Sequence, residues 1–128
     1  MTTYTEAAQL SDFLKYEEAP EVQFCRETVT VLSGQNLLAG TVLGTVTASG
    51  KVKAYDNDAV DGSQTASGIL LFAVDASGGD KKGVALVRGP AILATEALAW
   101  GAGVTTQGEK DAAVVDLKAL NILCRSAI

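Results

Sequence analysis

Residues 33–52 read SGQNLLAGTVLGTVTASGKV and place four glycines between short apolar runs. A phosphate-binding loop would need four residues between its glycines, followed by Lys and then Ser or Thr. Here five residues separate the last two glycines, and valine follows the lysine. The segment Thr41–Thr47 is rich in β-branched residues, which favour extended backbone, and Ala48–Gly50 has the composition of a turn. The stretch therefore predicts strands and turns, with the glycines at turn and bulge positions.

The composition indicates one globular domain with a core of small and branched side chains. The chain has 128 residues, of which 48% are hydrophobic but only 5% aromatic. This length is enough to bury a core without metals or disulfides. No run approaches membrane-spanning length, and the N-terminus lacks the basic start and apolar core of a signal peptide. We therefore expect synthesis in a reducing cytoplasm and no membrane partner.

The net charge of −5 is concentrated at the front of the chain. Residues 1–27 carry six acidic and two basic residues, whereas residues 28–128 carry nine acidic and eight basic residues. An acidic segment repels nucleic-acid phosphates, and the sequence contains no polybasic patch. The charge pattern argues against direct DNA or RNA binding and favours a protein partner.

The residue types argue against catalysis and against a bound metal or cofactor. The sequence has no histidine, which is the commonest general base and metal ligand. Cys25 and Cys124 lack the spacing of a zinc site or a redox pair and are expected to be free, buried or half-buried thiols. The loop Asp56–Gly62 resembles a calcium loop only superficially, because its register is wrong, and it predicts a surface turn. We predict no catalytic residue, no metal site and no cofactor.

The first 27 residues are expected to form a flexible arm, separate from a single domain of residues 28–128. They are charged, lack a clear period and contain Pro20. Their apolar residues could form one face of a short helix or alternate as a strand, and both alternatives stay open. Such a segment can become ordered on a partner, although a tail without a role is equally consistent. The candidate partner contacts are Leu10, Phe13, Leu14, Tyr16, Val22 and Phe24.

After residue 27 the pattern predicts a mainly β fold with one C-terminal helix, built of short strands and long loops (a β-rich α+β class). Strands are expected at Thr28–Leu32, Thr41–Thr47, Lys51–Tyr55, Ile69–Val74, Val84–Arg88, Ala91–Ala94 and Ile122–Arg125. The continuous apolar run Ile69–Val74 suits a strand buried on both faces and is the best candidate for the core. Leu71 and Phe72 of this run, with Trp100 as a core plug, form the predicted scaffold.

The helix is predicted from its caps and from the spacing of its apolar residues. Thr106 and Glu109 have the spacing of a capping box, and Asn121 can end the helix in the left-handed region. The expected buried face consists of Ala112, Val115, Ala119 and Ile122, widened by Leu117 and Leu120.

The succession of motifs from residue 28 to residue 125 carries a resemblance to a known family. The segments that carry it are Val31–Gly44, Asp61–Leu71, Val84–Gly89, Leu98–Trp100 and Asn121–Arg125. In order and spacing they resemble the head decoration proteins of tailed bacteriophages, the lambda gpD-like family. Each motif is weak alone, but their succession is specific.

The resemblance implies a homotrimer on the outer face of the expanded phage head, at three-fold and quasi-three-fold sites. There it would bind the major capsid protein and cement the shell against the pressure of packaged DNA. The arm in such proteins is typically mobile until it becomes ordered on the capsid, which would make residues 1–27 a capsid-binding arm. The implied trimer would rest on the scaffold of Leu71, Phe72 and Trp100. The arm is poorly shared, so its contacts cannot be carried over residue by residue.

Two other functions are compatible with the sequence. A phage tail or adaptor protein is close in class and would attach to the tail or portal. A small trimeric β enzyme or carrier module would need a bound cofactor or a modified Lys81. Because Lys81 follows a long, glycine-rich loop, a charged and solvated tip is the favoured interpretation.

Overall fold

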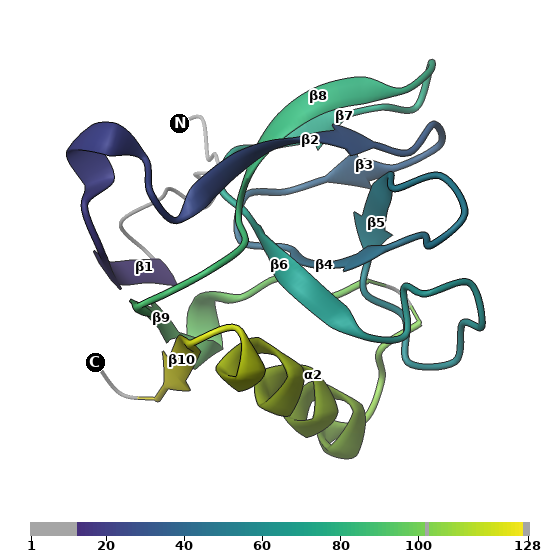
Figure 1. Cartoon of the computed structure of the whole chain (residues 1–128). Coiled ribbons are helices and arrows are strands. Elements are labelled where there is room, and N and C mark those ends of the chain that lie inside the picture. The colour runs from purple at the N-terminus through teal and green to yellow at the C-terminus, as the bar shows by residue number, and fades with distance from the viewer. Residues whose placement is uncertain (1–12, 102, 127–128) are drawn as a thin grey trace, which may run out of the picture.

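The computed structural model describes residues 13–101 and 103–126 of the chain (Figure 1). Within them the fold is mostly β, with one C-terminal α-helix, as predicted. The strands are β1 (Leu14–Glu17), β2 (Arg26–Val31), β3 (Asn36–Leu37), β4 (Val42–Thr45), β5 (Val52–Ala54), β6 (Ala66–Leu70), β7 (Val74–Asp75), β8 (Lys81–Leu86), β9 (Ala91–Ala94) and β10 (Ile122–Arg125). The helices are the short 3-10 turns η1 (Pro20–Val22) and η2 (Thr95–Ala97) and the α-helix α2 (Gln107–Ala119).

Five strands close into a barrel in the order β2–β5–β4–β6–β8. The neighbours are antiparallel except β2 and β5, which run parallel and pair at Val31 and Val52. The predicted strands on either side of Gly50 are confirmed as β4 and β5, and Gly50 itself has a φ of 73°, which glycine adopts without a steric clash. Gly44 lies at a register shift of β4, where a Cβ would come within 2.4 Å of the Ser63 carbonyl oxygen. The glycines of the opening stretch therefore include turn and bulge positions, as predicted.

A second sheet, in the order β1–β9–β10, lies beside the barrel and next to α2 (Figure 1). Its central strand β9 is antiparallel to β1 and parallel to β10. Leu14 at the start of β1 is opposite Leu93, and Arg125 at the finish of β10 is opposite Ala94. Both chain ends therefore leave the described body at the same end of this sheet.

The pairing of β1 with β9 corrects the predicted boundary at residue 27. The side chain of Phe13 is fully buried, Leu14 packs against the core, and Cys25 is fully buried. Residues 13–27 are therefore part of the folded body, which begins no later than Phe13. The sequence suggested a separate segment because its few apolar residues have no local partners, whereas β9, far away in sequence, supplies them. Leu10 lies outside the described residues.

The core consists of two clusters of buried side chains, and strands of the barrel contribute alternately to both. In β6, Ile69 belongs to the cluster facing α2 and Leu70 to the cluster inside the barrel. The predicted strand buried on both faces is thus confirmed as far as Leu70, and Leu71 is also buried. Phe72 is 49% exposed, so its predicted role in the core of the subunit is wrong. The chain bends at this point, between β6 and β7, and turns the ring outward.

The helix α2 has its predicted caps but buries only part of its predicted face. The Thr106 hydroxyl accepts a hydrogen bond from the Glu109 amide (3.2 Å), and Asn121 has a φ of 64°. The helical residues that are buried are Ala113 and Leu117, whereas Val115 is 67% exposed. The predicted face is therefore wrong at Val115 and Ala119, which are exposed, but right at Leu117 and Ile122, which are buried. Four successive apolar residues at 112–115 cover all sides of a helix, so their spacing could not select the buried side.

Candidate functional site

The segment from β1 to the start of β2, residues 14–26, projects from the body and reverses direction, and we call it the arm hairpin (Figure 1). Its two strands do not pair with each other, since β1 pairs with β9 and β2 pairs with β8 and β5. It reverses direction around η1, where Ala19 (φ 47°) and Gln23 (φ 54°) both adopt the left-handed conformation. This conformation costs a non-glycine residue about 1–2 kcal/mol. Backbone strain of this kind is commonly found where a surface has a function.

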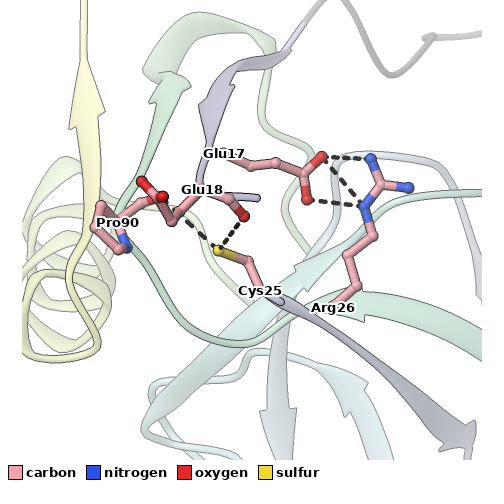
Figure 2. A network of polar contacts seen from close by, with 5 residues as sticks. All are labelled: Glu17, Glu18, Cys25, Arg26 and Pro90. Atoms are coloured by element: carbon pink, nitrogen blue, oxygen red, sulfur yellow. Dashed lines mark hydrogen bonds and ion pairs between the residues drawn. The ribbon is translucent and has the colours of Figure 1, made fainter. Parts of the chain in front are cut away.

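An ion pair and a buried thiol hold the arm hairpin on the body (Figure 2). The Glu17 carboxylate accepts hydrogen bonds from Nε (2.9 Å) and Nη2 of Arg26, and the side chains are only 5% and 17% exposed. The hydrogen bond to Glu17 raises the pKa of Arg26. The Cys25 thiol lies 3.6 Å from the carbonyl oxygen of Glu18 and 3.8 Å from that of Pro90, and can donate to either. The hairpin is therefore anchored to the turn that leads into β9.

Three large apolar side chains of the arm hairpin face solvent, and we call them the arm surface: Tyr16, Val22 and Phe24. The Tyr16 hydroxyl donates to the Glu18 carboxylate (2.8 Å), which raises the pKa of Tyr16. The guanidinium of Arg88 lies 5.9 Å from the centroid of the Phe24 ring. An exposed apolar group with charged neighbours is typical of a protein-binding surface.

The structure divides the six predicted arm contacts into three groups. Leu10 is outside the described residues. Phe13 is fully buried and Leu14 is partly buried against the core, so neither side chain presents a free surface in this conformation. The other three make up the arm surface. Capsid contact by these residues stays a prediction.

The predicted scaffold residues also separate. Leu71 lies in the core, whereas Phe72 is 49% exposed and Leu38 is 60% exposed. The two lie on segments that run side by side, because Leu37 pairs with Val74 and the Gly40 amide donates to the Leu70 carbonyl (2.7 Å). We call Leu38 and Phe72 the strand-exit surface.

Trp100 lies at the margin of the core, so its predicted role as a core plug holds in part. Its ring meets the ring of Tyr55 edge-on, with 6.4 Å between the two centroids. Lys110 Nζ lies 5.8 Å from the centroid of the Trp100 ring. One hollow of 360 Å³ lies between this ring and β3, and another of 350 Å³ lies between the ring and α2. The tryptophan therefore separates two surface hollows.

The acidic loops are shaped by hydrogen bonds to their own backbone, which confirms the surface turn predicted at Asp56–Gly62. Asp56 Oδ1 accepts from the Asp58 amide (3.0 Å), and Asp61 Oδ1 accepts from the amide (3.0 Å) and hydroxyl of Ser63. The Ser63 hydrogen bonds lower the pKa of Asp61 to about 2. Asp80 accepts from the Ser33 amide and pairs with Lys51 (2.6 Å), and these contacts lower its pKa as well. These carboxylates accept hydrogen bonds from the loops and hold the loops in their shape.

The remaining reactive groups are few in the part of the chain that the structure describes. Both cysteines there are free, as expected, and burial raises the pKa of Cys124 to about 11. Residues 13–101 and 103–126 contain no group of three or more potential metal ligands. No helix in the same ranges is long and apolar enough to cross a membrane.

Sequence reasoning missed the groups that orient the arm hairpin. The ion pair of Glu17 with Arg26 depends on a chain reversal that no glycine signals, since Ala19 and Gln23 are the left-handed residues. Leu38 could have been suspected, because adjacent leucines in an extended segment point to opposite sides. Arg88 reaches Phe24 from the segment between β8 and β9, more than sixty residues away in sequence, and the sequence holds no signal for this contact.

Comparison with known proteins assigns the chain to a family. No curated protein matches the chain at a significant level. The family model described as bacteriophage lambda head decoration protein D matches residues 3–122, which is nearly the whole chain. That family consists of structural proteins of the phage virion and is not a family of enzymes. The chain therefore belongs to the family of the bacteriophage lambda head decoration protein D, and it is a structural, β-rich head decoration protein of a phage capsid.

Proposed function

We propose that the protein is a cement that binds the outer surface of the expanded phage head and stabilises the shell against the pressure of packaged DNA. It binds the major capsid protein as a homotrimer at three-fold and quasi-three-fold sites, after synthesis in the host cytoplasm. Family membership supports the class of function. The observation that supports the mode of binding is the arm surface, an apolar group anchored close to the point where the N-terminal residues leave the body.

The arm surface and residues 1–12 together are proposed to contact the capsid. Val22 is 72% exposed and lies on a short 3-10 turn whose flanks are fixed by the Glu17–Arg26 pair and by Cys25. A surface that is already ordered loses little conformational entropy on binding. Anchoring the hairpin therefore favours affinity for a partner that has a matching apolar site.

The strand-exit surface and Trp100 are proposed to lie between subunits of the trimer. Phe72 and Leu38 expose large apolar side chains that association would remove from water. Because each is already about half buried in the subunit, full burial of the remainder would contribute on the order of 1 kcal/mol for each. Of the three predicted scaffold residues, Leu71 lies in the core of the subunit and Trp100 at its margin. Phe72 is exposed and is proposed to make a contact between subunits.

Stabilisation of the shell requires no catalytic group. A protein that binds the assembled lattice and not the free capsid subunit shifts the equilibrium toward the intact shell. Three linked copies of a weak contact give an avidity that greatly exceeds the affinity of one contact.

Cosedimentation of the purified protein with undecorated expanded heads, and with unexpanded procapsids, tests the proposal. We expect selective binding to expanded heads, and a loss of affinity of about tenfold or more when Val22 and Phe24 are both replaced by serine. The control is Val115→Ser, which removes a similarly exposed apolar group from α2 and should leave binding unchanged. Binding to tails and not to heads would contradict the cement function.

A further inference from the structure

A groove at the C-terminal end of α2 combines an apolar floor with two cations. It has a volume of 250 Å³ and is lined by Val114 and Lys118 of α2 and by Leu123, Cys124 and Arg125 of β10. Within residues 13–101 and 103–126, neither Lys118 nor Arg125 forms an ion pair. The groove also follows the open edge of β10, which pairs on one side only, with β9. Such a site suits a small apolar side chain next to carboxylates.

A segment with that chemistry lies at the other end of α2. In the loop Asp56–Asp61, Asp61 pairs with Lys53 (3.2 Å) and Asp56 accepts from the Asp58 amide, whereas the Asp58 carboxylate forms no ion pair within the described residues. Near the tip of the loop, Val60 is 94% exposed. The turn at Asp56 and the hydrogen bond from the Thr47 amide to the Asp61 carbonyl (2.9 Å) fix both sides of the loop. Val60 is therefore presented by an ordered loop, in which binding costs less entropy than in a free chain.

The loop and the groove of one chain cannot meet. The hydroxyl of Tyr55, directly before the loop, donates to the Glu109 carbonyl (3.1 Å) in the first turn of α2. The groove is lined by Val114 and Lys118, which follow Glu109 along α2 by roughly 8 Å and 14 Å of helix rise. An occupant with the chemistry of this loop must come from a second copy.

We propose that the Asp56–Asp61 loop of one copy docks in the groove of the next copy, with Val60 on the apolar floor and Asp58 facing Lys118 and Arg125. The contact is heterologous, because each copy contributes its loop to one neighbour and its groove to another. It goes beyond the proposed function by adding a loop and a groove to the strand-exit surface and Trp100 as surfaces that join neighbouring copies. It rests on the proposed self-association, but not on capsid binding.

Exchanging the charges across the contact tests this proposal on the full-length protein. The variants Asp58→Lys and Lys118→Asp/Arg125→Asp should each weaken self-association on the order of tenfold, measured by sedimentation velocity over a concentration series. The triple variant, which carries both exchanges, should restore the association of the wild type. Val60→Ser should also weaken association, because it removes the apolar group from the groove. High salt should weaken association of the wild type, because it screens the contact of Asp58 with Lys118 and Arg125.

The double variant Lys81→Asp/Lys82→Asp is the control, since it makes the same change in charge on β8 and should leave association unchanged. All the replaced side chains are solvent-exposed, and circular dichroism verifies that each variant is folded. Association that is insensitive to the charge exchange, or that the triple variant fails to restore, overturns the contact. A monomeric wild type at every concentration also overturns it, whereas cosedimentation with heads decides separately on the cement function.

Discussion

At the scale of single residues, the ion pair of Glu17 with Arg26 does more for the arm hairpin than any exposed pair does for the loops. Both side chains are largely withdrawn from water, and three hydrogen bonds join the two groups. By contrast, Lys51 and Asp80 are each about one-third exposed. Loss of a hydrogen-bonded charge in a low-dielectric site leaves its partner unsatisfied, which is the main cost of such a change.

We expect Glu17→Gln to lower the free energy of unfolding by about 1–3 kcal/mol, because Arg26 keeps its charge and loses its counter-ion. Urea denaturation followed by circular dichroism measures this change. In the matched control, Asp80→Asn removes the carboxylate of an exposed pair and should cost no more than about 1 kcal/mol. Equal effects of the two substitutions would show that the arm pair has no special role.

At the scale of elements, the sequence predicted the existence of most strands and of the helix but not the partners of some of them. Strands β4, β5, β9 and β10 and both helix caps follow from local signals, namely β-branched runs, turn glycines, Thr106 and Asn121. The pairing of β1 with β9 joins segments more than seventy residues apart, and such pairing has no local signature. Phe72 was misassigned for a related reason, since an apolar run does not show where a strand leaves the sheet.

The orientation of α2 can be tested by comparing two truncations. Leu117→Ala removes a fully buried side chain and should lower the free energy of unfolding by about 2–5 kcal/mol. Val115→Ala changes an exposed position and should alter it by less than about 0.5 kcal/mol. Thermal denaturation of the two variants measures both effects, and a larger loss of stability for Val115→Ala than for Leu117→Ala would place Val115 on the buried side, as the sequence predicted.

At the scale of the whole molecule, the folded body begins no later than Phe13 and not at residue 28. The described body begins with a fully buried phenylalanine and a strand that covers one side of β9. Residues before this point can contribute to binding without contributing to the described core. Residues 13–26 contribute to the body, and by our proposal they also bind the capsid.

Two deletions separate these roles. Removal of residues 1–12 should leave a folded protein with weakened binding to expanded heads, whereas removal of residues 1–24 deletes Phe13 and β1 and should destabilise the fold by at least about 3 kcal/mol. Thermal denaturation and cosedimentation are the two measurements. If the protein that lacks residues 1–12 binds heads as tightly as the full-length protein does, residues 1–12 are excluded from the capsid contact.

The order of strands in the two sheets also has a consequence for how the protein is made. β1 lies against β9, whose other neighbour β10 is formed by residues 122–125, and β2 lies against β8. On the ribosome the first strands emerge long before the strands that cover them. The side chain of Phe13 is therefore exposed to water until most of the chain has been synthesised. The barrel can therefore close only after β8 has been synthesised, and the sheet of β1 only after β9 and β10 have been, so the apolar residues of β1 and β2 stay exposed in the nascent chain until then.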